Sequence, residues 1–161
     1  MSTPLELASL FESLAKQLSL LRQLVEELTT CRPAFVAMDL EGIYLHISKQ
    51  TEICENLRKT EVARAAAWKA ATENLGLPPV DGNLRGWLEG IDKEDADRFR
   101  RLLTELAVAE GEVRHQNRMH ITLVDGSRRT LNVLGNALAA FSPTYALPRS
   151  LQSIIAEKAP A

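Results

Sequence analysis

Residues 112–138 read EVRHQNRMHITLV, DGS and RRTLNVLGNAL, and this stretch decides the fold that the sequence predicts. Apolar and polar side chains alternate along the first run, and they alternate again after the Asp125-Gly126 dipeptide. Alternation with a period of two is typical of a strand with one buried face, and Asp-Gly between two such runs is a typical hairpin turn. The stretch therefore predicts a long antiparallel β-hairpin.

The predicted buried face of this hairpin contains two polar side chains, His115 and Asn117, followed by Met119. A buried polar group must be hydrogen-bonded within the protein or satisfied by water or a ligand. His115 is therefore interpreted either as a buried neutral imidazole or as a ligand contact. No nucleophile, base and orienting group converge in the sequence, and no paired carboxylates share a buried face. We expect a sensing or scaffolding protein, not an enzyme.

The composition is that of a soluble globular protein of one domain with an added element, with 161 residues, 45% hydrophobic and 25% charged. A formal net charge of −2 does not provide the basic surface that nucleic-acid binding requires. No stretch approaches the ~18 apolar residues of a membrane span, and the N-terminus lacks a signal-peptide pattern. Cys31 and Cys54 lack the spacing of metal ligands, so we expect reduced thiols in a cytoplasmic protein without a metal.

A long N-terminal helix is predicted from its start signal, Thr3-Pro4 with Glu6, to about Thr30, before Pro33. Apolar residues follow one another in steps of four and three, which indicates a coiled-coil seam. The seam residues are Leu7, Phe11, Leu14, Leu18, Leu21, Val25 and Leu28. We expect this seam to form a homodimer interface. The alternative is that the helix lies only on its own domain.

The remaining elements are predicted from local patterns. They are strands at 34–40 and 43–47, a helix at 61–75 ended by Gly76, a loop at 79–90, a helix from Asp92 to Gly111, and a short tail helix at 147–158.

Several segments, taken in order, resemble a PAS domain. They are DLEGI at 39–43, the segment from Trp68 to Leu77, GWLEGIDKED at 86–95, Gly111-Glu112, and the segment from Arg118 through the Asp-Gly turn to Arg129. The resemblance covers 34–140. It divides the chain into a dimerisation helix at 4–31, a PAS-like domain at 34–140 and a C-terminal tail at 141–161. Residues 48–66 depart from the pattern, because the family's second strand leads almost at once into the Trp-bearing helix.

The resemblance implies an α+β fold, with a five-stranded antiparallel sheet, helices on one face and a long amphipathic helix in front. His115, Asn117 and Met119 would then face a small-molecule pocket from a central strand, with Trp68 on the helical wall. Output would pass through a signalling partner protein. The alternative is an adaptor or dimerisation protein without a ligand.

The resemblance also bears on cofactors. Haem in this family is bound by a His on the helix before the hairpin, where this chain has Arg100, so only His115 or His120 remain as ligands. A covalent flavin would need a Cys in an Asn-Cys-Arg helix, and Cys54 lies in ICEN instead. Both cofactors are therefore disfavoured.

Overall fold

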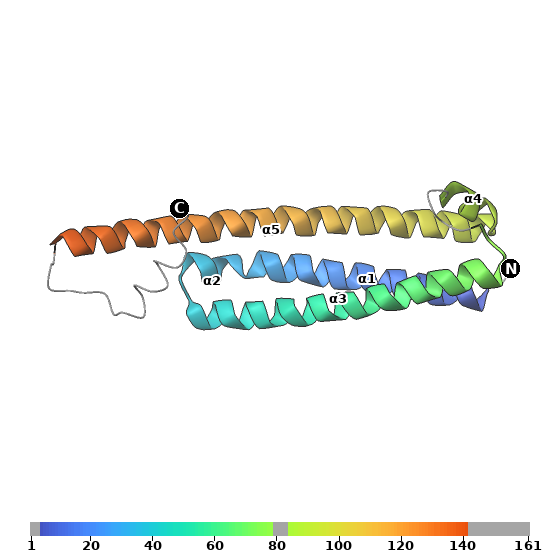
Figure 1. The fold of residues 1–161 in the computed structure, drawn as a ribbon, viewed down its shortest axis with the longest axis horizontal. Coiled ribbons are helices and arrows are strands. Elements are labelled where there is room, and N and C mark those ends of the chain that lie inside the picture. The colour runs from blue at the N-terminus through green and yellow to red at the C-terminus, as the bar shows by residue number, and fades with distance from the viewer. Residues whose placement is uncertain (1–3, 79–83, 142–161) are drawn as a thin grey trace. The chain divides into compact units, whose positions relative to one another are not determined.

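The computed structural model describes residues 4–78 and 84–141, and its regular elements in these ranges are helices (Figure 1). They are α1 (Leu5–Thr30), α2 (Arg32–Val36), α3 (Leu40–Asn74), α4 (Leu84–Glu89) and α5 (Lys93–Phe141). The chain divides into two units, Met1–His120 and Ile121–Ala161, and each is described by itself. The tail helix predicted at 147–158 lies outside the described residues.

The prediction of an α+β fold with a PAS-like sheet is wrong. The described residues contain no strand, and the segments assigned to strands lie mainly in helices. Residues 34–39 fall in α2 and the turn after it, residues 40 and 43–47 in α3, and residues 112–138 in α5. The described residues form no sheet, so they do not support the resemblance to a PAS domain.

The first unit shows why 112–120 is helical. Residues of α5 that are buried or half-buried recur in steps of three and four: Phe99, Leu102, Leu106, Ala109, Val113, Gln116 and His120. This is the heptad spacing of a helix packed against other helices. Because two of these positions are polar, the apolar residues that remain give the impression of alternation with a period of two.

α3 follows the same rule with more polar residues. Its inward positions are Ile43, His46, Gln50, Ile53, Leu57, Thr60, Arg64, Ala67 and Ala71, again in steps of three and four. The side chain of Asp39 accepts a hydrogen bond of 3.1 Å from the amide of Gly42 and so caps the helix. The Asp39–Gly42 segment, which resembled a hairpin, is therefore the start of a helix.

The N-terminal helix is confirmed, since α1 ends at Thr30. Pro4 occupies its N-cap position without a side-chain hydrogen bond, and Thr3 lies outside the described residues. Pro33 does not end helical structure, because it lies in the first turn of α2, and α2 begins directly after Cys31. Past α3, Gly76 adopts the left-handed conformation, with φ of 61°, that glycine accommodates at the end of a helix.

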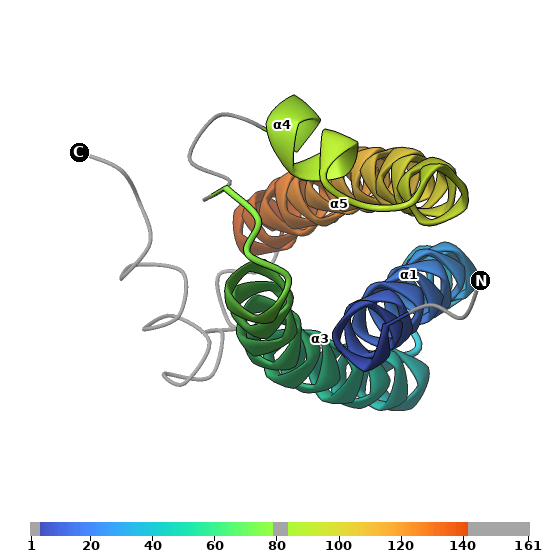
Figure 2. The same cartoon turned by 90° about the vertical axis from the view of Figure 1, so that its right-hand side faces the viewer.

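In the first unit, residues of α1, α3, α4 and of α5 up to His120 form one apolar core. Figure 2 shows these helices viewed along their length. Its densest part is aromatic: Trp87 of α4 and Phe99 of α5 lie 5.1 Å apart between ring centroids, and Trp68 of α3 lies 5.1 Å from Phe99. The Trp87 indole donates a hydrogen bond of 3.1 Å to the Thr72 hydroxyl. Trp68, predicted to contact a ligand, is thus part of this core.

Candidate functional site

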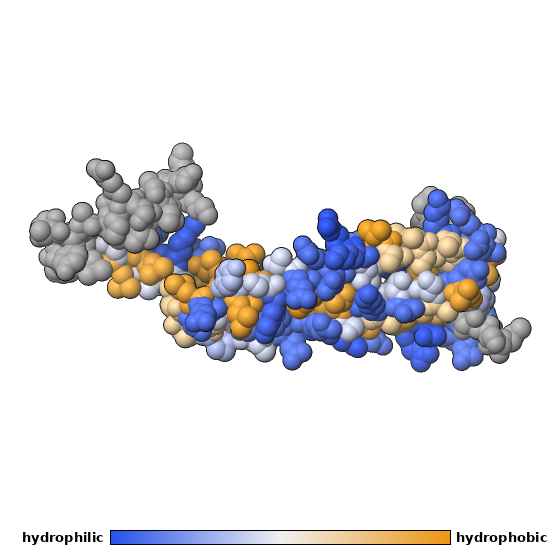
Figure 3. Space-filling view, turned by 90° about the horizontal axis from the view of Figure 1, so that it is seen from below, coloured by the Kyte–Doolittle hydropathy of each residue, from blue (hydrophilic) through white to orange (hydrophobic). Residues whose placement is uncertain are grey.

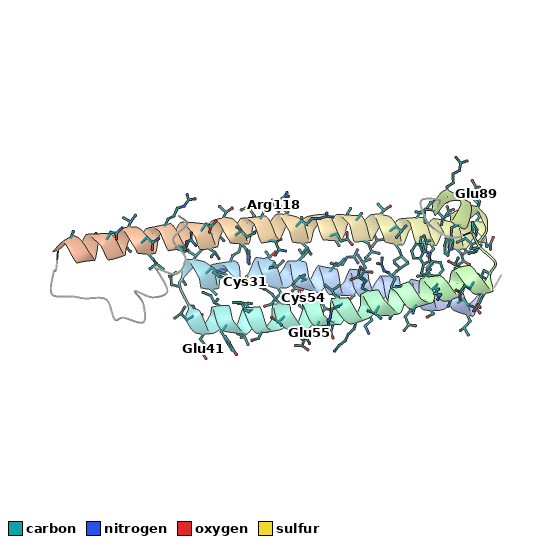
Figure 4. The ribbon with its side chains drawn as sticks, viewed as in Figure 1. Cys31, Glu41, Cys54, Glu55, Glu89 and Arg118 are labelled. Carbon is teal, nitrogen blue, oxygen red and sulfur yellow. The ribbon has the colours of Figure 1, made fainter. Side chains whose placement is uncertain are left out.

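Away from the aromatic residues, the core of the first unit becomes polar. A group that we call the polar cluster gathers where α1 meets α2, and it includes residues from α1, α2, α3 and α5. Its members are Glu27, Cys31, Arg32, His46, Gln50, Gln116 and His120. Figure 4 labels Cys31 among the helices. The polar cluster is the arrangement of the first unit that comes nearest to a reactive site, because it contains a cysteine beside a histidine.

The thiol of Cys31 is fully buried and held by three neighbours. It donates to the Leu28 carbonyl oxygen at 3.3 Å, it accepts from the Gln50 amide at 3.6 Å, and it lies 3.4 Å from Nε2 of His120. That Nε2 is also 2.6 Å from the Leu28 carbonyl oxygen, which can only accept a hydrogen bond. Nε2 therefore carries a hydrogen, and Nδ1 of His120, 3.7 Å from the thiol, is the ring nitrogen left to accept one.

Burial raises the pKa of the Cys31 thiol, the hydrogen bond from Gln50 lowers it by less, and the charge of Glu27 raises it further. The nucleophilic form of cysteine is the thiolate, which a raised pKa disfavours at neutral pH. The geometry therefore makes the pair of Cys31 and His120 a structural contact between α1 and α5. It does not have the properties of a catalytic dyad.

Other pairs of the polar cluster also connect different helices. Glu27 of α1 pairs with Nδ1 of His46 in α3, and both side chains are largely buried, with 15% and 19% exposed. Arg32 of α2 donates to Oε1 of Gln116 in α5, whose amide in turn donates to Glu112 at 2.6 Å. Polar pairs in an otherwise apolar seam allow only one alignment of the helices to satisfy every group. We interpret the polar cluster as the feature that fixes the register of α1, α3 and α5.

The residues predicted to face a ligand lie elsewhere. His115, Asn117 and Met119 are exposed on α5, and the central strand from which they were expected to face inward is absent from the described residues. The buried polar residues of this segment are their neighbours Gln116 and His120, which the alternating pattern assigned to the wet face. The signal that could have identified them is their heptad spacing from Val113.

The predicted dimer seam is covered by the chain itself. Leu7, Phe11, Leu14, Leu18 and Leu21 belong to the core cluster that includes residues of α3, α4 and α5. Leu28 is also buried, and Val25 is half-buried. This is the stated alternative, in which the helix lies on its own domain. A second copy or another partner would have to bind a different surface.

One such surface, which we call the α5 stripe, lies on the second unit. Its residues Ile121, Val124, Leu131 and Leu134 are 61%, 46%, 53% and 54% exposed. At 3.6 residues per turn they fall within about 140° of the helix circumference. The opposite side carries mainly polar residues, among them Arg129 and Asn136, with Val133, which is 67% exposed, as an apolar exception. The α5 stripe is therefore the apolar face of an amphipathic helix, and no part of the described chain buries it.

A second exposed apolar surface lies on the first unit, and we call it the α2–α3 patch. It consists of Val36, Leu40, Tyr44 and Ile47, which are 75%, 76%, 74% and 49% exposed. Asp39 and Glu41 lie within it. Figure 3 shows one face of the molecule, on which orange apolar side chains lie exposed among blue polar ones.

Comparisons of the chain with protein families, with curated proteins and with solved structures found no match. Across residues 4–78 and 84–141, no helix is long and apolar enough to cross a membrane, and no group of three or more potential ligand side chains is arranged to bind a metal.

Proposed function

We propose that the protein is a non-enzymatic interaction module that binds a helix of another polypeptide chain along the α5 stripe. The observation that carries this proposal is the exposure of Val124, Leu131 and Leu134 on one face of a regular helix. Full burial of an aliphatic side chain of this size contributes about 1.5–3 kcal/mol. Covering several half-exposed ones is therefore a substantial driving force for association.

The spacing of these residues also suits a helical partner. Val124 and Leu131 are seven residues apart and Leu134 follows three residues later, so they present one line of anchors along the helix. Amphipathic helices bind one another through anchors at such intervals. A flat or extended partner would not match the full length of the line.

The non-enzymatic part of the proposal is supported by the polar cluster. The cysteine and histidine that would be the natural candidates for chemistry are used to join α1 to α5, and the Cys31 thiol has no exposed surface. We place the module in the cytoplasm because neither of its two cysteines, Cys31 and Cys54, forms a disulfide.

The experiment that tests the proposal is photo-crosslinking in cells that naturally contain the protein. A photoreactive amino acid is placed on the stripe, at Val124 or Leu131, or on the opposite face, at Asn136. We expect a defined crosslinked product from the stripe positions alone, and Leu134→Glu should remove it. Mass spectrometry then identifies the crosslinked chain.

The matched control is Asn136→Glu, which adds the same charge on the opposite face and should leave the product unchanged. Equal crosslinking from both faces, or no product from the stripe, would contradict the proposed function.

A further inference from the structure

We propose that the chain bound by the α5 stripe is a second copy of this protein, which receives the stripe on its α2–α3 patch. This inference rests on the proposed function, and it names the partner. It also replaces the interface predicted from sequence, since the seam of α1 is already covered within the chain.

The apolar residues of the two surfaces suit each other. Leu40, Tyr44 and Ile47 follow the spacing i, i+4, i+7 and so lie in one line on α3. They face away from the buried seam of the same helix, as their exposed fractions of 76%, 74% and 49% show. The patch therefore presents a helical ridge, which is the kind of surface that another amphipathic helix packs against.

The charges beside the two surfaces are opposite. At 3.6 residues per turn, Arg128 falls within the arc of the stripe, between Val124 and Ile121, whereas Asp125 lies about 40° beyond Ile121 and Arg129 lies on the opposite side of the helix. Residues 36–47 contain Asp39 and Glu41 and no lysine or arginine. Within the described parts of the chain, neither Arg128, Arg129 nor Glu41 takes part in an ion pair. These charges are therefore available to a partner.

This distribution of charge favours a contact between stripe and patch over a contact between two stripes. Two stripes side by side would bring Arg128 of both copies together, and like charges at an interface disfavour the complex. A stripe on a patch brings Arg128 near Asp39 and Glu41. Every copy has both surfaces, so a second copy of the chain provides the patch that the stripe of the first copy would bind.

The test is sedimentation velocity of the full chain over a range of concentrations, with two pairs of substitutions. The first variant, Leu131→Glu with Leu134→Glu, removes the stripe. The second, Leu40→Glu with Tyr44→Glu, removes the patch. We expect the wild type to dimerise in the micromolar range and each variant alone to be at least tenfold weaker. All four positions are exposed, and circular dichroism should confirm unchanged helicity.

Mixing the two variants is the decisive measurement. One variant retains an intact patch and the other an intact stripe, so the mixture should form a dimer that neither forms alone. A patch variant that dimerises like the wild type would show that stripes pair with stripes and would overturn the inference. A mixture that remains monomeric would overturn it as well.

Charge reversal gives an independent measurement. Arg128→Glu should weaken the dimer, and adding Glu41→Lys to the same chain should restore it. The control, Glu55→Lys on an exposed part of α3, should not. Failure of Glu41→Lys to restore the dimer would contradict the proposed pairing of charges.

The fate of the inference is separable from that of the proposed function. The wild-type protein could stay monomeric at about 100 µM, well above the micromolar range expected for the dimer, while its stripe crosslinks to a different protein. That result would overturn the inference and leave the proposed function standing. Absence of any product from the stripe overturns both.

Discussion

Nε2 of His120 lies 2.6 Å from the carbonyl oxygen of Leu28, so a side chain of α5 is hydrogen-bonded to the backbone of α1. The imidazole also meets the Phe35 ring edge-on, with ring centroids 5.5 Å apart. Each contact joins His120 to a different segment of the first unit. His120 thus provides a hydrogen bond at one end of the seam of this unit. The other end of the seam is held by the packing of Trp68, Trp87 and Phe99.

Replacement of His120 should be costly, and replacement of His115 should not. His120→Ala removes the hydrogen bond to Leu28 and the contact with Phe35, and we expect a loss of about 1–3 kcal/mol in the free energy of unfolding. His115→Ala changes an exposed side chain, for which about 0.5 kcal/mol or less is expected. Urea unfolding followed by circular dichroism compares the two variants. The reverse order of stability would contradict the helical assignment of this segment.

The two thiols should differ sharply in reactivity. Cys54 is exposed, whereas Cys31 is buried with a raised pKa, so a thiol reagent should modify one cysteine quickly in the native protein and the second only on unfolding. Counting modified thiols over time with Ellman's reagent measures this directly. Cys54→Ser should abolish the fast phase, and Cys31→Ala should abolish the slow one. A fast phase that survives Cys54→Ser would show that the thiol of Cys31 is open to solvent.

The same raised pKa predicts a dependence of stability on pH. The folded protein retains the Cys31 proton at a pH where the unfolded chain, with the usual value of 9.0, has released it. The contribution to stability is therefore complete below that value and is lost as pH rises through the folded pKa. Between pH 8 and 10.5 (roughly the range around the usual thiol pKa), the wild type should lose stability more steeply than Cys31→Ala. Parallel curves would contradict the assignment.

The sequence was sufficient for α1, because its fully buried residues are all Leu or Phe and preserve the helical period. It was misleading for α5, whose core positions include Gln116 and His120. Once polar residues occupy buried positions, hydropathy no longer reports which face is buried, and the remaining residues fit a strand as well as a helix. Asp39 adds a second lesson, since an acidic residue followed by Gly42 fits an N-cap as well as a turn.

The polar cluster could not be predicted for a related reason. Its contacts join residues far apart in the chain, such as Arg32 with Gln116 and Glu27 with His46. The spacing within one helix does not reveal a partner on another. These residues could have been assigned to one layer only by aligning the buried positions of α1, α3 and α5, which recur in steps of three and four in each helix.

The pair of Glu27 and His46 should contribute more to the choice of register than to stability. His46→Leu alone leaves Glu27 largely buried without its partner, so we expect a loss of about 3 kcal/mol or more. Adding Glu27→Leu should recover most of it, because apolar side chains of similar size can replace a buried pair. Denaturant unfolding of both single variants and the double variant completes the cycle. A double variant as unstable as His46→Leu would mean that the pair is needed for stability itself.

Gly111 distinguishes the observed helix from the predicted hairpin most directly. The sequence predicts that this glycine ends a helix, and a left-handed conformation there would make alanine unfavourable. In the structure it lies inside α5, and a Cβ at this position would meet no atom within 4 Å. Gly111→Ala should therefore stabilise the first unit by about 0.5–1 kcal/mol, the difference in helix propensity between the two residues.

Thermal unfolding measures the change, and Gly76→Ala is the matched control. Gly76 has a φ of 61°, so alanine there is strained and should destabilise the protein. A decrease in melting temperature for Gly111→Ala would contradict a continuous α5 through this position.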